Sequence, residues 1–194
     1  MSYEPILQNV ARHIALDDAE TDLFTSLLQP ERRAKKELIL HEGQVCKNIH
    51  YVHSGTLRAY YVDREGKEST IMFAIADWWI TDMYCFINRL PAMLFIEAVE
   101  DSVIVRLNKE DLDRLYAEVP KFERFFRIIM QNAYIREQLR VIQNLSQPAK
   151  QRYEHFLEKY PQIAGKVTQK QIASYLGITP EFLSNIRGRK GKIS

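Results

Sequence analysis

The sequence has only two cysteines among its 194 residues, Cys46 and Cys85, and neither belongs to a CxxC pair or a Cys/His cluster. A structural zinc site and an iron–sulfur cluster are therefore not expected, and both thiols should be reduced and partly buried. No stretch approaches the roughly 20 consecutive apolar residues of a membrane-spanning helix. Residues 1–20 contain polar and acidic side chains throughout and lack a signal-peptide core. We expect a cytoplasmic protein without a metal, a cofactor or a membrane partner.

Catalytic motifs are also missing from the sequence. The chain has no recognisable Ser/His/Asp arrangement, no HExxH motif and no glycine-rich phosphate loop. We therefore predict that the protein is not an enzyme. Its apolar fraction of 46% is enough for real cores, and 194 residues leave room for one medium domain and one small domain.

Charge is nearly balanced over the whole chain, whose formal net charge is +2. The balance hides an uneven distribution, because residues 147–194 hold nine Lys or Arg against three Glu and so carry +6. Residues 1–146 therefore carry −4. A basic C-terminal region on an acidic body places positive charge where contacts with nucleic-acid phosphates would need it.

Residues 167–189, VTQKQIASYLGITPEFLSNIRGR, predict two short helices joined by a tight turn. Thr168 is a good N-cap, and Gln171 three positions later can close a capping box. Gly177 ends the first helix, since glycine adopts the left-handed conformation without a Cβ penalty. This is the build of a helix-turn-helix, whose second helix enters the major groove of DNA.

The second helix is capped by Thr179 and begins with Pro180, where a missing N–H is harmless. The apolar residues of the motif are expected to form its buried seam: Ile172, Ala173, Leu176, Ile178, Phe182, Leu183 and Ile186. Glu181 can accept a hydrogen bond from cytosine, and Asn185 can pair with adenine. The predicted DNA contacts are Thr168, Gln169, Thr179, Pro180, Glu181, Ser184, Asn185, Arg187, Arg189 and Lys190.

The sequence pattern of the N-terminal part of the chain changes from helical to β-rich near residue 33. Residues 4–30 have helical periodicity and are closed by Pro30, whereas residues 33–107 alternate short β-rich runs with turn signals. Strands at this spacing, without long helices between them, predict an antiparallel sandwich or barrel. A short helix is expected at 109–118, stopping before Pro120.

Residues 121–146 predict one long helix with two apolar faces. One face, which includes Phe122, Phe126 and Ile129, is expected to cover the β-domain. The other repeats isoleucine every seven residues, which favours a two-stranded coiled coil. We predict a homodimer through Phe125, Ile128, Ile135, Leu139, Ile142 and Leu145. The alternative is a single amphipathic helix that packs only on its own domain.

Gln147-Pro148 is expected to break the long helix and act as a hinge. The order of β-barrel, long helix, hinge and helix-turn-helix resembles the CRP/FNR family of bacterial transcription regulators over nearly the whole chain. Residues 35–68 look like the opening strands of the family's jelly roll, with turns at Glu42-Gly43 and Ser54-Gly55. The resemblance implies an α+β fold: an N-terminal antiparallel β jelly-roll of the cyclic-nucleotide-binding type, a long dimerisation helix and a C-terminal winged helix-turn-helix domain. The expected boundaries are 1–120, 121–146 and 147–194.

The candidate ligand site departs from the pattern of this family. Members that bind cyclic AMP carry Gly-Glu followed about ten residues later by Arg-Ser or Arg-Thr, and the arginine pairs with the phosphate. This chain has Thr81-Asp82 and Ala92-Met93 at the matching positions, and Arg89 comes three residues too early. Burying an unpaired phosphate costs several kcal/mol. We therefore expect no binding of cyclic AMP.

The residues at this position leave two interpretations open, a pocket for an apolar or aromatic effector and a core packed shut. The candidate pocket residues are Trp78, Trp79, Thr81, Asp82, Met83, Tyr84, Ala92 and Met93. The leading function is a homodimeric regulator that binds a pseudo-palindromic double-stranded DNA operator, with RNA polymerase as a candidate partner. The alternative is a small-molecule sensor whose helix-turn-helix has lost specific DNA binding.

Overall fold

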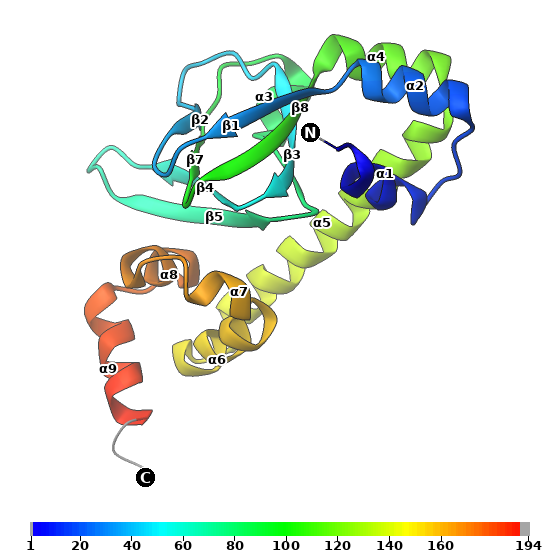
Figure 1. Ribbon diagram of the computed structural model, residues 1–194. Helices are drawn as coiled ribbons and strands as arrows, with labels where there is room; N and C mark the ends of the chain where they lie inside the picture. The colour runs from blue at the N-terminus through cyan, green and yellow to red at the C-terminus, as the bar shows by residue number, and fades with distance from the viewer. Residues whose placement is uncertain (1, 191–194) are drawn as a thin grey trace.

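The computed structural model describes residues 2–190, without the side chains of Arg189 and Lys190. A β-roll with flanking helices lies at the top of Figure 1, a long helix runs diagonally away from it, and a helical head lies below. The β-roll and its helices are called the sensor here, and residues 147–190 are called the head. No helix in residues 2–190 is long and apolar enough to span a bilayer.

The sensor is built from two four-stranded antiparallel sheets. One has the order β1-β8-β3-β6 and the other the order β2-β7-β4-β5, so neighbouring strands are mostly distant in sequence. The strands are β1 Gln29–Arg33, β2 Leu38–Leu40, β3 Asn48–Ser54, β4 Thr56–Val62, β5 Glu68–Ile75, β6 Trp79–Ile80, β7 Phe95–Ala98 and β8 Ser102–Asn108. This arrangement confirms the predicted antiparallel jelly roll.

Two of the predicted turns require glycine. Gly43 and Gly55 have φ angles of 81° and 93°, which side-chain-bearing residues rarely adopt. At Gly55 a Cβ atom would also meet Ser102 Oγ at 2.2 Å. The tight connection between β3 and β4 therefore excludes any larger residue.

The helices of the sensor correct one prediction. They are α1 Glu4–Ala11, α2 Asp18–Ser26, α3 Met83–Asn88 and α4 Lys109–Glu118. Helix α4 matches the predicted helix, but residues 4–30 are not helical throughout, because Gln29–Arg33 pairs with β8 as an edge strand. An edge strand tolerates Pro30, because the outer side of such a strand has no neighbouring strand and therefore needs no backbone N–H donor. Helix α3 was not predicted.

The long helix α5, Lys121–Ser146, leaves the sensor and passes toward the head. In its first two turns, Phe122, Phe125 and Phe126 are buried in the sensor core. Trp79 packs edge-on against Phe125 and Phe126, with ring centroids 6.1 and 5.2 Å apart, and Phe122 packs on Phe24 of α2. These contacts confirm that Phe122 and Phe126 cover the β-domain, and they anchor the helix.

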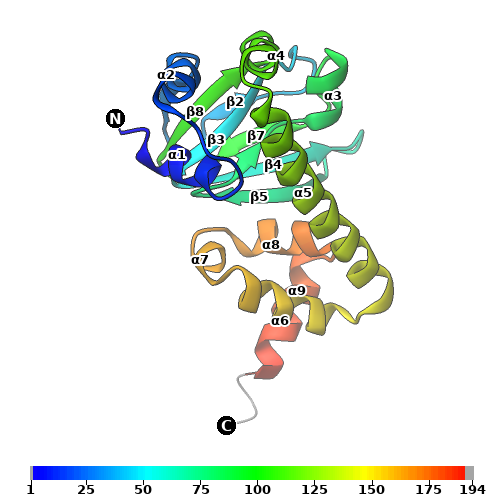
Figure 2. The same ribbon diagram turned by 90° about the vertical axis from the view of Figure 1, so that its right-hand side faces the viewer.

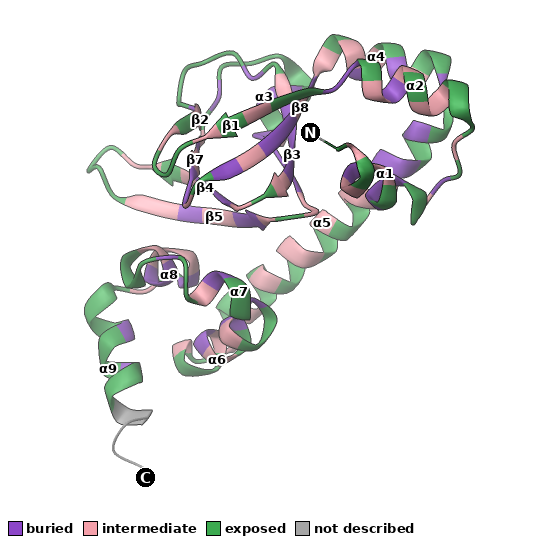
Figure 3. Cartoon of the chain, in the orientation of Figure 1, coloured by how far each residue is buried: buried purple, intermediate pink, exposed green. Residues whose placement is uncertain are grey.

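The head consists of four helices, within the described residues: α6 Ala149–Lys159, α7 Pro161–Ala164, α8 Gln169–Leu176 and α9 Pro180–Lys190. A small core joins them, in which Ile163, Ala173 and Leu183 are fully buried. The predicted wing has no counterpart among residues 147–190. Figure 3 shows that α8 is the most buried of these helices, whereas α9 is largely exposed.

Candidate nucleic-acid interface

Local chemistry fixes the start of α8 as the sequence predicts. The Thr168 hydroxyl accepts from the N–H of Gln171 at 3.2 Å, and the Gln171 side chain accepts from the N–H of Thr168 at 2.9 Å. This reciprocal pair is a capping box. Gly177 ends the helix with a φ of 67°, as the turn requires.

Helix α9 presents one buried and one exposed face. Thr179 accepts from the N–H of Phe182 at 3.1 Å and so caps the helix start. Leu183 and Ile186 face the head core, as predicted. Phe182 does not, because it is 51% exposed. The helix packs through the narrow stripe of residues 183 and 186, and position 182 falls at its edge.

The predicted DNA contacts gather on the outside of the head. Thr168, Gln169, Thr179, Pro180, Glu181, Ser184, Asn185 and Arg187 are all exposed. They come from the start of α8, the turn and the outward face of α9, and in Figure 1 α8 lies directly below β5 of the sensor whereas α9 points away from it. Arg189 and Lys190 belong to α9, but their side chains lie outside the described ones. The arrangement leaves a polar helix face free to approach a groove.

The first helix of the motif docks on the sensor. Ser174 Oγ donates to the Glu68 carbonyl at 2.8 Å and accepts from the N–H of Thr70 at 2.8 Å, both on β5. The Phe73 ring of the same strand lies 5.5 Å from the Tyr175 ring. The sensor sheet therefore holds the head in a defined pose through α8.

An ion pair adds a second tie between the two parts. Lys166 Nζ lies 2.7 Å from Glu100 Oε1, and Thr56 donates to the same oxygen at 2.7 Å. Burial opposes ionisation of Glu100, yet the bonds from Lys166 and Thr56 hold its pKa below the usual value. Glu100 is therefore a carboxylate at neutral pH, and the tie is charged.

The candidate effector residues differ in burial and do not line a single pocket. Trp79, Thr81, Asp82 and Ala92 are buried, Trp78 and Met83 are partly buried, and Tyr84 and Met93 are exposed. Trp79 donates through Nε1 to Asn9 Oδ1 at 3.1 Å. The buried members serve as packing for the sensor core.

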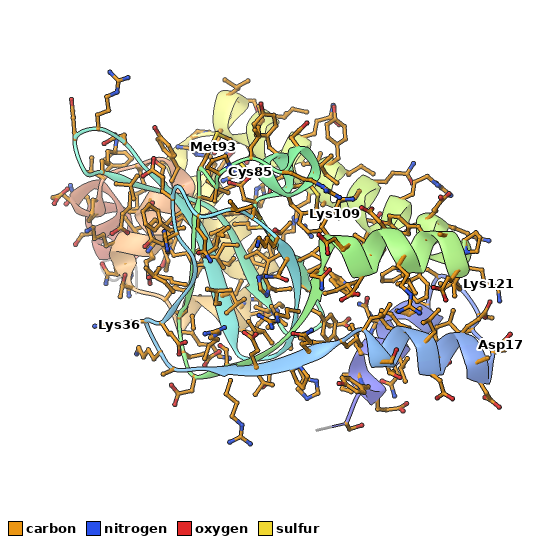
Figure 4. All side chains as sticks on the ribbon, turned by 90° about the horizontal axis from the view of Figure 1, so that it is seen from above. Asp17, Lys36, Cys85, Met93, Lys109 and Lys121 are labelled. Carbon is orange, nitrogen blue, oxygen red and sulfur yellow. The ribbon has the colours of Figure 1, made fainter. Side chains whose placement is uncertain are left out.

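Asp82 is the most tightly engaged residue of this set, at 2% exposure. Its Oδ2 accepts from the N–H groups of Met93 and Leu94 at 2.8 and 3.1 Å, and its Oδ1 accepts from that of Cys85 at 3.3 Å. Figure 4 labels Cys85 and Met93 on the same side of the sensor. The carboxylate satisfies backbone donors that would otherwise be free for an outside anion.

Neither position 92 nor position 89 brings an arginine side chain to Asp82. Ala92 stands where the cyclic-AMP pattern has arginine, and it is 3% exposed. The Arg89 side chain is 65% exposed and extends toward Asp113 of α4, with NH2 3.6 Å from Oδ2. Neither candidate position therefore places an arginine beside Asp82.

Comparison with known proteins decides the family. The family model for the cyclic nucleotide-binding domain matches residues 30–119. Electron transport regulator A of Shewanella oneidensis is 24% identical over 188 residues, covering 90% of this chain and 74% of that protein. Regulatory protein HlyX of Actinobacillus pleuropneumoniae is 25% identical, covering 90% and 77%. The chain belongs to the CRP/FNR family.

Solved structures of this kind share the fold. The c-di-GMP responsive global regulator CLP of Xanthomonas campestris superposes with a TM-score of 0.74 at 14% identity, covering 90% of this chain and 92% of that one. A chain from Eubacterium rectale assigned to the CRP/FNR family of transcriptional regulators gives 0.72 at 21% identity, covering 91% and 85%. As a CRP/FNR-type chain, the protein is a DNA-binding transcription regulator.

The predicted dimer surface of this CRP/FNR regulator is mostly open in the single chain. Ile135, Leu139, Ile142 and Leu145 are at least half exposed, whereas Ile128 is partly buried. Phe125 is fully buried in the sensor core. Phe125 is therefore not part of the exposed stripe in the single chain, since its ring packs against Trp79.

Sequence reasoning missed the residues that join α5 to both domains. Arg136 lies over the Trp78 ring at 4.3 Å, and Arg140 lies over the Tyr175 ring at 5.1 Å. Both arginines follow Phe122, Phe126 and Ile129 at spacings of three and four along the sensor-facing side. That periodicity was the available signal, but only the apolar members of the face were predicted.

Proposed function

We propose that the protein acts as a homodimer that reads a pseudo-palindromic operator with helix α9 of each protomer, and that cyclic AMP does not control it. The observation that carries this proposal is the outward face of α9. Glu181, Ser184 and Asn185 are exposed there, while Leu183 and Ile186 hold the helix to the head. Side chains early in a recognition helix reach base edges.

The base contacts and the phosphate contacts have different roles in this proposal. Asn185 and Glu181 suit adenine and cytosine, whereas Arg187 adds positive charge that is independent of sequence. Thr168 and Gln169 lie at the start of α8, where N–H groups and short polar side chains favour a phosphate. The boundaries at residues 120 and 146 separate sensing, dimerisation and DNA contact.

Dimerisation is supported by the exposed stripe on α5. Leu145 is 84% exposed, and together with Ile135, Leu139 and Ile142 it forms an apolar surface with heptad spacing. A stripe of this kind on a soluble helix needs a cover, and a second α5 fits it. Replacing Leu139 with Lys should give monomers in sedimentation velocity, whereas the same change at exposed Leu38 of β2 should not.

The input to the sensor is proposed to be something other than cyclic AMP, or nothing at that site. A cyclic phosphate would meet the Asp82 carboxylate instead of an arginine, and like charges repel strongly at a buried position. Calorimetry with cyclic AMP should give no heat of binding. Binding at micromolar or lower concentration would overturn this part of the proposal.

Regulation through RNA polymerase contact in the cytoplasm completes the proposed role, and the protein acts as a regulator and not as an enzyme. The rival function is a sensor whose helix-turn-helix no longer binds DNA. Exposure of the full α9 reading face speaks for the regulator.

Selection of bound sequences from a random pool, followed by a mobility shift, tests the main proposal. The wild type should bind a two-fold symmetric site with half-sites about one helical turn apart. Arg187→Ala should weaken binding to all sequences and reduce the salt slope by about 1, while Arg64→Ala on the sensor hairpin should change neither. Failure to select any sequence, with the protein folded and dimeric, would favour the rival function.

A further inference from the structure

A cavity of about 50 Å³ lies at the hinge between the long helix and the head. Figure 2 shows the place, where the lower end of α5 meets α6 and α8. Its walls carry Arg136 and Arg140 from α5, and Arg152, His155 and Lys159 from α6. No acidic side chain lines it among the described residues. The cavity is therefore a cationic one in a chain whose net charge is only +2.

The local partners of these cations leave positive charge unmatched. Arg140 NH2 lies 2.8 Å from Glu137, whereas Arg152 donates through NH1 to the neutral Asn144 Oδ1 at 2.9 Å. The Arg152 Nε is buried and has no hydrogen-bond partner among the described residues. A buried donor without a partner costs free energy, so an acceptor at this place would be stabilising.

Two further cations of the cavity, Arg136 and Lys159, contact aromatic rings. Arg136 lies over Trp78, and Lys159 Nζ lies 5.3 Å from the Tyr160 ring centroid. Cation–π contacts leave the N–H groups of both side chains able to donate elsewhere. The site thus offers several charged donors, which is the chemistry that binds a phosphoryl group.

We propose that this hinge cavity binds a phosphate-bearing small molecule, with the phosphoryl group among Arg136, Arg152 and Lys159. A volume of about 50 Å³ accommodates one such group and leaves any remaining part of the ligand at the open side. The site is separate from the Thr81–Met93 segment of the sensor. Its ligand can be an inorganic phosphate or a nucleotide, since both present the same oxygens.

Binding here has a mechanical consequence, which rests on the proposed regulator function. One wall belongs to the dimerisation helix and the other to the head, so an anion that bonds to both fixes the angle between them. A ligand that prefers one angle shifts the population of DNA-binding poses. Anion binding itself needs no DNA, so the two proposals can fail separately.

Calorimetry on the full chain with pyrophosphate, against chloride of equal ionic strength and without DNA, tests the site. The wild type should bind. Arg152→Gln should weaken binding by about tenfold, as expected for one lost charged hydrogen bond, and Lys159→Gln should weaken it by a similar factor. Lys150→Gln is the matched control, because Lys150 is exposed on the same helix and does not line the cavity.

The two sources of phosphate are separated by a second titration, with adenosine monophosphate and adenosine triphosphate. A nucleotide that binds at least tenfold more tightly than pyrophosphate assigns the site to nucleotides, and equal affinities assign it to the inorganic ion. Circular dichroism melts establish that each variant folds.

Two outcomes would overturn the proposal. One is a lack of specificity: chloride at equal ionic strength gives the same binding heat as pyrophosphate, or Lys150→Gln weakens pyrophosphate binding as much as Arg152→Gln does. The other is absence of pyrophosphate binding together with a flatter salt dependence of DNA binding in Arg152→Gln, since the cavity would then be part of the DNA phosphate track.

Discussion

The sensor and the hinge treat buried charge in opposite ways. In the sensor, Asp82 receives three backbone N–H groups, and Arg58 pairs with Glu68 and Glu97 at 2.6 and 2.9 Å. At the hinge, basic side chains from two helices face one cavity that no carboxylate lines among the described residues. The chain supplies its own counter-charges in the first region and leaves them to an outside group in the second.

This difference teaches that a family fold does not fix where a small molecule enters. At the positions of the family's cyclic-AMP pattern, Asp82 is buried and accepts from three backbone N–H groups, and Ala92 stands in place of the arginine. The open cationic site lies instead at the joint that sets the pose of the head. Stability should therefore depend on the charges of the sensor, and ligand response on those of the hinge.

The largest expected effect comes from Arg58, which is 3% exposed. Replacing it with Ala leaves Glu68 and Glu97 without their cation and removes the donor to Thr70. The free energy of unfolding should fall by about 3 to 5 kcal/mol. Urea unfolding at fixed protein concentration measures the loss.

Arg114 provides the matched control for that experiment. It pairs with Glu118 in the open on α4. Arg114→Ala should lower the free energy of unfolding far less than Arg58→Ala does, because exposed ion pairs contribute little. Equal losses at Arg58 and Arg114 would contradict the view that the sensor depends on internal charge pairing.

A somewhat smaller loss is expected for Asp82→Ala. The N–H groups of Cys85, Met93 and Leu94 would lose their acceptor in a buried place, at a cost of about 2 kcal/mol. Asp63 also accepts from backbone N–H groups, those of Glu65 and Lys67, but in an exposed turn. Urea unfolding of Asp63→Ala should show a loss of well under half that size.

The sequence predicts the head better than it predicts the sensor's interior, for a physical reason. The Thr168 cap and the left-handed Gly177 act through neighbouring residues, so a short segment contains all the information. The ends of α4 and α5 are likewise set by Asn108, Pro120 and Pro148, which are visible in sequence.

Most of the errors involve contacts between distant residues, whereas the exposure of Phe182 depends on its place at the edge of the α9 stripe. Gln29–Arg33 is a strand because β8 pairs with it, not because its own residues favour one. Phe125 is buried by Trp79, and Ser174 is tied to Glu68, 106 positions away. No local periodicity carries this information. The sequence does not decide between an effector pocket and a packed core for the same reason, since only folding brings Asp82 to Met93.

An intermediate effect is expected from pH through His50. Burial, with Arg33 and Arg106 nearby, lowers its pKa to about 3. The unfolded chain, with an ordinary pKa near 6.5, therefore binds a proton that the folded chain does not between about pH 6.5 and 3. Stability should fall on acidification in that window, by at most about 1.4 kcal/mol per pH unit from this residue.

Replacing His50 with Gln should remove that contribution. Urea unfolding at several pH values between 7 and 5 would then give a shallower slope than in the wild type. An unchanged slope would mean that His50 takes up its proton in the folded sensor.

The smallest effect concerns salt and the hinge. Arg136 and Arg140 are four residues apart on α5, and they face Arg152 across the cavity. Like charges at this spacing destabilise by a few tenths of a kcal/mol and are screened by salt. Raising potassium chloride should stabilise the wild type by about 0.5 kcal/mol more than Arg152→Gln. Thermal melts of both proteins measure the difference, and parallel salt curves would contradict it.

Operator binding by this regulator should need no help from cyclic AMP. Fluorescence anisotropy of a selected operator, with and without millimolar cyclic AMP at fixed salt, tests this most directly. The dissociation constant should be the same in both conditions, with a tenfold or greater preference over random DNA. A dissociation constant that falls tenfold when cyclic AMP is added would contradict it.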